Sequence, residues 1–557
     1  MNPVILLVAD GNAELLLGEF GRYARDYDVR LVRTAQDATA LCTEVTEAGE
    51  RLALVVADAS MFAASHPSDP HGAVLSTLSE CRQLVPSSRS LVVSPFDRFL
   101  VDSDALRLGQ AKGKFDGLLL MPRGARDEEF HHAVTELLSD WGSTALDPEV
   151  EAVRIVGDPS DTLTLSLRDL LVRLGMPHRV HEPDSDIGRE IIAAHGEADL
   201  PLVDVLTRGV VPVRSARELA AAFYERPDEV DEESVFDLCI VGAGPAGLAT
   251  AVYGASEGLT TVVLEAEAIG GQAGASSMIR NYLGFPRGIS GMRLAQRARQ
   301  QAGRFGARFI AGWDAVGISA SAGPEPHLVH TEGGDLRCRS VVIATGAAYR
   351  TLGVPGIEAL NGRGVFYGSA MTAAREMEGQ DVVVVGGGNS AGQAALHLAR
   401  FARSVTIVVR RDGLAATMSQ YLIDEIAWSR RIEVRPRCEV VDGGGGTQLE
   451  WIELRDTATG DLERRACPGL FLLLGADPRC EWLPQDLALD PRGFVLTGRD
   501  VPRDAWADGL PPESLATSIP GVFAVGDVRA GSMKRVAAAS GEGSSVVPLV
   551  HAHLADL

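Results

Sequence analysis

The chain has 557 residues, 46% of them hydrophobic and 23% charged, and a formal net charge of -23 at pH 7. This length exceeds one hydrophobic core and predicts roughly three to five domains. The composition is typical of a chain that folds almost throughout. The negative charge, with no offsetting cluster of Lys and Arg, disfavours nucleic acid and anionic lipid as partners.

The N-terminus, MNPVILLVADGN, enters a buried-strand pattern at once and has no signal-peptide features. The apolar runs LALVVA and LFLLLG have strand length and are too short to span a membrane. We therefore expect a cytoplasmic protein. No Cys-x-x-Cys occurs, which disfavours a zinc cluster or a local redox pair, and no metal site is predicted. The cysteines are Cys42, Cys81, Cys239, Cys338, Cys438, Cys467 and Cys480.

Residues 1–145 alternate short apolar strands with helical stretches. The strands are VILLVAD, LALVVAD, SLVVSP and DGLLLMP. This spacing predicts an α/β domain with a doubly wound parallel sheet.

This first domain resembles a response-regulator receiver. Asp10 and Asp58 stand where that family binds magnesium and accepts phosphate, and Ser94 stands at its hydroxyl position. Only one acid follows the first strand, however, and Met121 replaces the expected Lys. Such a site should bind phosphoryl groups poorly. We expect a degenerate receiver that serves for interaction, with phosphorylation of Asp58 left open.

Residues 150–224 resemble a thioredoxin or glutaredoxin fold. The strand AVRIVG precedes a helix from about Thr164, and Pro201 opens a later strand, as the cis-proline of that fold does. The loop GDPSDTL, where the family has its cysteines, has none, so it cannot exchange disulfides. The domain is either a docking surface or a relic. Residues 225–235 are acidic and indicate a linker.

Two strand–turn–helix–strand motifs follow. In the first, the G-x-G-x-x-G turn can seat a pyrophosphate at the helix N-terminus, and Glu265 ends the second strand, where it can bind ribose hydroxyls. The turn consists of Gly242, Gly244, Pro245, Ala246 and Gly247. This motif predicts an adenine-dinucleotide site.

The second motif has the G-x-G-x-x-A form. Its second strand ends in Arg410 and Arg411, which suit a 2′-phosphate and favour NADPH over NADH. The alternative is two solvated arginines at a strand end. The turn and first helical residues are Gly386, Gly388, Asn389, Ser390 and Ala391.

Two dinucleotide folds in one chain suggest FAD for the first and a nicotinamide for the second. Further strand ends complete the first fold. They contribute Ala344, Thr345 and Gly346, then Gly526 and Asp527, followed by Lys534, Arg535 and Val536 at the start of a helix. We therefore expect a discontinuous FAD domain, 236–352 and 480–557, with a nicotinamide domain inserted at 353–479.

This order of motifs resembles the low-molecular-weight thioredoxin reductases, within the pyridine nucleotide-disulfide oxidoreductases, over essentially all of 236–557. GGQAG, with Gly271 and Gln272, and NYLGFP, from Asn281, match stretches that line the flavin in that family. The resemblance implies FAD and NADPH, a ribityl contact from Asp527, and a homodimer. The whole layout resembles fused response regulator/thioredoxin-disulfide reductases.

One feature of that family is missing. In the family, the flavin reduces a Cys-x-x-Cys disulfide, which then reduces thioredoxin. The matching positions here are Gly368, Ser369, Ala370 and Met371, none of which has a reversible two-electron couple. Cys239 and Cys338 have no partner nearby in sequence, and their pairing in space is left open.

We therefore expect an enzyme that takes hydride from NADPH and passes electrons from FAD to a small oxidant: oxygen, a quinone, a low-molecular-weight disulfide or a metabolite. Three alternatives remain: a thioredoxin reductase with a distant cysteine pair, a ferredoxin-NADP reductase-like protein, and a redox or NADPH sensor acting through a protein partner of the N-terminal domains. His551 and His553 are the nearest catalytic candidates, and we expect surface residues.

Overall fold

The computed structural model describes residues 2–61, 70–111, 114–124, 126–145, 151–195, 199–206, 208–211, 213–224, 226–231, 233–276, 278–321, 323–368, 373–507 and 509–557. The chain forms two compact units. The first comprises residues 1–147, 377–383 and 387–438, and the second comprises residues 148–376, 384–386 and 439–557. None of the helices in these ranges is long and apolar enough to cross a membrane.

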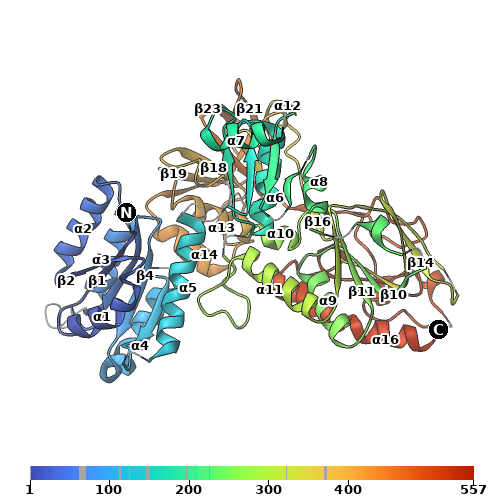
Figure 1. The fold of residues 1–557 in the computed structure, drawn as a ribbon, viewed down its shortest axis with the longest axis horizontal. Helices are drawn as coiled ribbons and strands as arrows, with labels where there is room; N and C mark the ends of the chain where they lie inside the picture. Colours follow the sequence, from blue (N-terminus) through green and yellow to red (C-terminus); the bar gives the residue numbers. More distant parts are fainter. Residues whose placement is uncertain are drawn as a thin grey trace. The chain divides into compact units, whose positions relative to one another are not determined.

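The first unit begins with a five-stranded parallel sheet of strand order β2-β1-β3-β4-β5 (Figure 1). Its strands are β1 Val4–Val8, β2 Asp28–Val32, β3 Leu52–Asp58, β4 Arg89–Ser94 and β5 Gly117–Leu120. Four of these strands match the prediction. The edge strand β2 was not predicted, because its residues are only half-buried and lack a continuous apolar run.

Helices cover both faces of this sheet, which confirms the doubly wound fold. Alternate residues of β1 pack against α2, α3 and α4 on one face and against α1 and α5 on the other. The helices are α1 Ala13–Phe20, α2 Ala35–Glu47, α3 Pro70–Leu84, α4 Phe96–Ala111 and α5 Glu128–Ala145.

The second unit begins with a four-stranded sheet of order β7-β6-β8-β9. β6 runs parallel to β7 and antiparallel to β8, as in a thioredoxin-type fold, and the Leu200–Pro201 peptide is cis. The elements are β6 Val153–Val156, α6 Thr162–Leu174, β7 His178–His181, α7 Asp186–His195, β8 Leu202–Val205, β9 Gly209–Val211 and α8 Ala216–Ala221. Asp161 caps α6 by accepting a hydrogen bond from the Thr164 N–H at 2.9 Å.

A seven-stranded sheet follows, with order β12-β11-β10-β15-β14-β13 and β26 paired in parallel with β15. Its strands are β10 Val235–Val241, β11 Thr261–Glu265, β12 Arg308–Ala311, β13 Ala315–Ser319, β14 His327–Thr331, β15 Gly334–Ile343 and β26 Val522–Ala524. One face packs on helices α9 Pro245–Ser256, α11 Gly291–Arg304, α15 Val536–Ser545 and α16 Val547–Ala555. Val230, in the expected linker, is buried against the other face.

The second dinucleotide motif folds as β18 Asp381–Val385, α13 Asn389–Leu398 and β19 Ser404–Val408. β19 pairs in parallel with β20 Ile432–Arg435, next to α14 Gln420–Trp428, in the first unit. In the second unit, β17 Val365–Tyr367 pairs in parallel with β24 Gly469–Leu472. These parallel strands confirm a second Rossmann-type fold.

Candidate functional site

The first glycine turn follows β10 and opens α9. Gly242 has a φ of +109°, and a Cβ there would lie 2.4 Å from the Ala344 carbonyl oxygen. At Gly247 a Cβ would lie 1.9 Å from the Gly242 oxygen. The turn therefore closes only with glycine at both positions. Gly244, the residue before Pro245 and Ala246, has no atom within 4 Å of a Cβ position, which leaves open space at the helix N-terminus.

Glu265 ends β11 and folds back onto this turn. Its carboxylate accepts hydrogen bonds from the Ala243 N–H at 2.7 Å and from the Glu267 N–H at 3.0 Å. Burial raises the pKa of Glu265, and these two hydrogen bonds oppose the rise. The predicted acid is thus held at the glycine turn.

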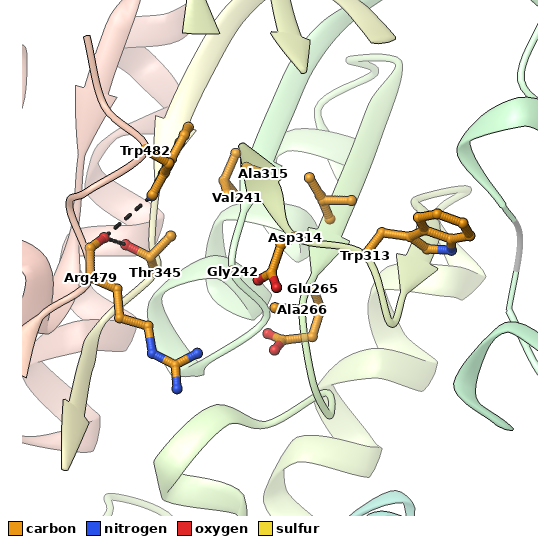
Figure 2. Close-up of a pocket in the computed structure, with 11 residues that line it drawn as sticks. Val241, Gly242, Glu265, Ala266, Trp313, Asp314, Ala315, Thr345, Arg479 and Trp482 are labelled. Atoms are coloured by element: carbon orange, nitrogen blue, oxygen red, sulfur yellow. Dashed lines mark hydrogen bonds between the residues drawn. The ribbon is translucent and has the colours of Figure 1, made fainter. Parts of the chain in front are cut away.

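A pocket lies at the carboxyl ends of β10 and β11, where parallel strands of this fold bind ligands. Figure 2 shows Arg479 and Trp482 on one side and Trp313 on the other, with Glu265 between. The predicted residues Gly242, Glu265 and Thr345 line it, and Ala344 and Gly346 flank Thr345 in the chain. Trp313, Asp314, Arg479 and Trp482 were not predicted. Of these, only Trp313 and Asp314 could have been found from the sequence, since they lie two and three residues after β12, a parallel strand of the same sheet.

Gly526 and Asp527 lie near the N-terminus of α15. The half-buried carboxyl group of Asp527 has no hydrogen-bond partner among the residues described, and burial raises its pKa. Lys534 donates to the Asp527 carbonyl oxygen at 2.8 Å, Arg535 stands at the N-cap position of α15, and Val536 begins the helix. Asp527 is therefore an acceptor that a hydroxyl-bearing ligand could satisfy.

The remaining predicted residues of this site occupy a short helix and the loop after it. Gly271 and Gln272 begin α10 Gly271–Gly274, and the Gln272 amide donates to the carbonyl oxygen of Ala347. Asn281 is exposed and lines no described pocket.

The second glycine turn lies between β18 and α13. Gly386 has a φ of +143°, and Gly388 has no atom within 4 Å of a Cβ position. Asn389 bonds to Ser419 on the neighbouring loop, at 2.7 and 3.0 Å, while Ser390 and Ala391 complete the first helical turn. This turn also leaves room at a helix N-terminus.

Arg410 and Arg411 follow β19 and are exposed. Neither guanidinium forms an ion pair with any residue of the described ranges. Two exposed cations at this strand end fit a phosphate group.

Gly368 is the first of the four residues that we aligned with the Cys-x-x-Cys motif. Its φ is +85°, and a Cβ there would lie 2.5 Å from the Tyr349 ring. A cysteine therefore requires a left-handed backbone and a displaced tyrosine. Ser369, Ala370 and Met371 lie outside the described residues.

All seven cysteines lie in the described part of the chain, where all are buried and none forms a disulfide. Cys239 and Cys338, on neighbouring strands, are 0% exposed. A hydrogen bond with Cys239, together with burial, raises the pKa of Cys338. The two cysteines are thus adjacent in space, which the sequence left open, but their side chains are fully buried in the core beside the sheet.

The C-terminal histidines lie on α16. His551 pairs with Glu257 at 3.2 Å, and His553 packs on Phe523, the middle residue of β26. In the receiver-like domain, Asp58 is fully buried and accepts hydrogen bonds from Asn12 at 2.8 Å and from Ser60 at 2.7 Å. No cluster of metal-ligating side chains occurs in the ranges searched.

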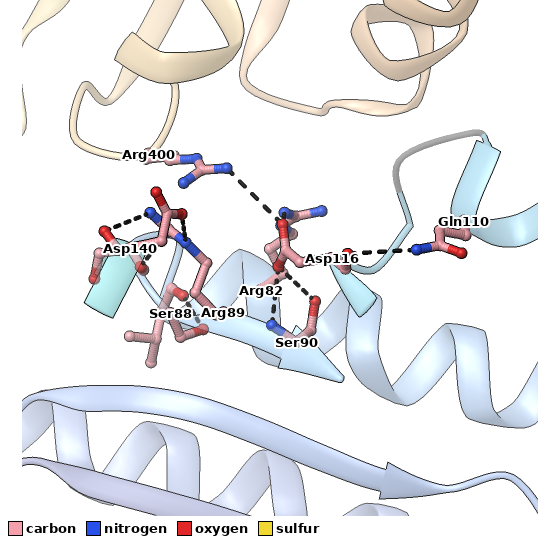
Figure 3. A network of polar contacts seen from close by, with 10 residues as sticks. Arg82, Ser88, Arg89, Ser90, Gln110, Asp116, Asp140 and Arg400 are labelled. Atoms are coloured by element: carbon pink, nitrogen blue, oxygen red, sulfur yellow. Dashed lines mark hydrogen bonds and ion pairs between the residues drawn. The ribbon is translucent and has the colours of Figure 1, made fainter. Parts of the chain in front are cut away.

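The receiver-like domain contacts the second nucleotide fold within the first unit (Figure 3). Arg400, just beyond α13, lies 3.9 Å from Asp116, which also pairs with Arg82 at 3.0 Å. Burial and the nearby Arg89 lower the pKa of Arg400 to about 9. The backbone oxygen of Gln83 accepts a hydrogen bond from Arg431 at 3.3 Å. Sequence reasoning did not predict this contact.

Residues 236–543 match the pyridine nucleotide-disulphide oxidoreductase family. The chain belongs to this family. The relatives that this chain resembles include thioredoxin reductases. That of Peptoclostridium acidaminophilum is 33% identical over 319 residues, 56% of this chain and 95% of the relative. That of Mycolicibacterium smegmatis is 35% identical over 318 residues, 56% of this chain and 94% of the relative.

Solved structures of thioredoxin reductases also resemble this chain. The Lactococcus lactis thioredoxin reductase aligns with a TM-score of 0.52 and 30% identity, over 58% of this chain and 100% of that one. The T. acidophilum enzyme aligns with a TM-score of 0.52 and 27% identity over the same shares. Thioredoxin reductases use FAD and NADPH. The open glycine turns, the half-buried Asp527 carboxyl group and the exposed Arg410 and Arg411 fit these cofactors.

Proposed function

We propose that this chain is an NADPH-dependent FAD oxidoreductase that delivers electrons to a small oxidant without a thiol relay. When bound, FAD accepts a hydride from NADPH and returns two electrons to an acceptor. The observation that carries the proposal is that both nucleotide turns are intact, whereas Gly368 stands in a conformation that disfavours cysteine.

In this proposal, the first fold (236–352 and 480–557) holds FAD. The turn from Gly242 to Gly247 seats the pyrophosphate, Glu265 binds a ribose, and Asp527 accepts from the ribityl chain. The residues that complete the proposed site are Gly271, Gln272, Asn281, Ala344, Thr345, Gly346, Gly526, Lys534, Arg535 and Val536.

The second fold (353–479) holds NADPH in the same proposal. The turn from Gly386 to Ala391 seats its pyrophosphate, and Arg410 and Arg411 bind the 2′-phosphate, which an acid would repel. The role of the protein is to orient both nucleotides and exclude water. We also propose a cytoplasmic homodimer with degenerate N-terminal domains at 1–145 and 150–224, the first lacking a working phosphate site.

The burial of Cys239 and Cys338 weighs against a distant cysteine pair as a thioredoxin-reducing relay, since a protein disulfide must reach the attacking thiol. A net charge of -23 weighs against a ferredoxin partner, which is itself acidic. A sensor is the second candidate, favoured by the contact of the receiver-like domain with the second nucleotide fold.

The test is an acceptor screen. The protein is reduced anaerobically with NADPH, and the return of the flavin absorbance is followed after adding oxygen, quinones, small disulfides or thioredoxin, one at a time. We expect rapid return with a small oxidant and none with thioredoxin. The variant Cys239→Ala/Cys338→Ala should behave the same. Return of the flavin absorbance with thioredoxin alone, if abolished in that variant, would overturn the proposal. Failure of every oxidant to support turnover would favour the sensor.

A further inference from the structure

Two carboxylates lie close together at the end of β11. Glu265 is tied to the glycine turn by backbone hydrogen bonds, and Glu267 follows two residues later. The pyrophosphate that the proposed function places at this turn carries negative charge of its own. Without compensation, the charge of Glu267 would oppose binding there.

Two arginines from distant parts of the chain compensate Glu267. Arg173 donates to one of its carboxylate oxygens at 3.0 Å, and Arg479 donates to the other at 2.8 Å. Although burial opposes it, these two cations hold the pKa of Glu267 below its ordinary value. Arg479 lines the pocket beside Thr345 and Trp482.

Arg173 does not belong to the FAD fold. It lies in the last turn of α6, in the thioredoxin-like domain, and its side chain is 22% exposed. Packing fixes this helix against the FAD fold. Ala268, the residue after Glu267, is buried in the hydrophobic core of the thioredoxin-like domain, and Gln296 donates to the Leu174 carbonyl oxygen at 3.3 Å. The arginine is therefore held at the carboxylate pair by a rigid helix.

We propose that the thioredoxin-like domain is part of the FAD site, with Arg173 as a positioning residue that neutralises Glu267 and so keeps the end of β11 able to receive the dinucleotide. The inference rests on the placement of FAD in the proposed function. It gives this cysteine-free domain a role that requires no disulfide chemistry.

The test measures FAD affinity of the full-length apoprotein by quenching of flavin fluorescence. Arg173→Ala should weaken binding about five- to tenfold, since the pair is partly solvated. Arg173→Lys should retain most of the affinity. The control Arg179→Ala, which removes an exposed arginine of the same domain paired with Glu151, should change nothing.

A second variant separates charge from packing. If the loss comes from uncompensated Glu267, the double variant Arg173→Ala/Glu267→Gln should bind FAD within about threefold of wild type, because the carboxylate charge is gone. A double variant as weak as Arg173→Ala alone would overturn the proposal, as would unchanged affinity in Arg173→Ala.

The pH profile gives a readout that a structural role would not move. Glu265 accepts hydrogen bonds as a carboxylate, so FAD affinity should fall as pH drops through its raised pKa. The charges around it are Glu267, Arg173, Arg479 and Asp314. Removing Arg173 should shift that fall to higher pH, and Lys should restore it. Failure of wild-type protein to bind FAD at all would instead refute the proposed function.

Discussion

In the first glycine turn, two substitutions three residues apart should separate an effect on FAD binding from an effect on the stability of the apoprotein. Gly244→Ala places a methyl group where no protein atom lies within 4 Å, at a φ of -70° that alanine adopts freely. The apoprotein should be unchanged or more stable by up to about 1 kcal/mol. The methyl group fills the space assigned to the pyrophosphate, so FAD should bind about 1–3 kcal/mol more weakly, roughly five- to 150-fold in Kd.

Gly247→Ala should do the opposite. Its methyl group would lie 1.9 Å from the backbone oxygen of Gly242, which the turn holds in place. We expect the apoprotein to lose about 3 kcal/mol or more, seen as a lower unfolding midpoint in denaturant before any FAD is added.

The matched control is Gly303→Ala on α11, an exposed helical position with nothing within 4 Å. It should stabilise the apoprotein by up to about 1 kcal/mol and leave FAD affinity unchanged. Wild-type FAD affinity in Gly244→Ala would refute the placement of the pyrophosphate. Equal destabilisation by Gly244→Ala and Gly247→Ala would refute the assigned packing of the turn.

Three further predictions concern other parts of the chain. Arg410→Ala/Arg411→Ala should raise KM for NADPH about ten- to 100-fold and barely change that for NADH in steady-state assays; equal effects would contradict the 2′-phosphate assignment. The double variant Gly368→Cys/Met371→Cys should not confer thioredoxin reduction, whereas thioredoxin turnover by this variant would show that only the thiols were missing. Gly368→Cys alone should lower the free energy of unfolding in denaturant by about 1–2 kcal/mol. Asp116→Ala removes the carboxylate that pairs with Arg82 and Arg400. It should lower the free energy of unfolding by about 3–5 kcal/mol and speed proteolysis of the receiver-like domain. Unchanged proteolysis would show the contact to be unimportant.

Much of the fold could be predicted because its signals are local. Each glycine turn lies between a strand and a helix within about thirty residues, so Gly242 and Gly388 could be assigned from spacing alone. The edge strand Asp28–Val32 escaped because it lacks a buried apolar run. The strand Val522–Ala524, which pairs in parallel with β15, could be predicted only from the Gly526–Asp527 motif that follows it, far along the chain.

The charged surroundings of the sites could not be predicted in the same way. Arg479 and Arg173 reach Glu267 from 212 and 94 residues away, and no motif marks either. Arg400 meets Asp116 only because two separately folded surfaces match. Such pairs arise from tertiary packing, which a periodicity or a short motif does not encode.

The most direct test of electron transfer without a thiol relay is the electron capacity of the protein. The FAD-loaded protein is titrated anaerobically with dithionite, and flavin reduction is followed at its visible absorbance alongside reactive thiols in the denatured protein. The account predicts that titration ends at about two electrons per FAD and exposes no new thiols. An endpoint near four electrons per FAD, with two thiols appearing, would reveal a redox-active disulfide and contradict it.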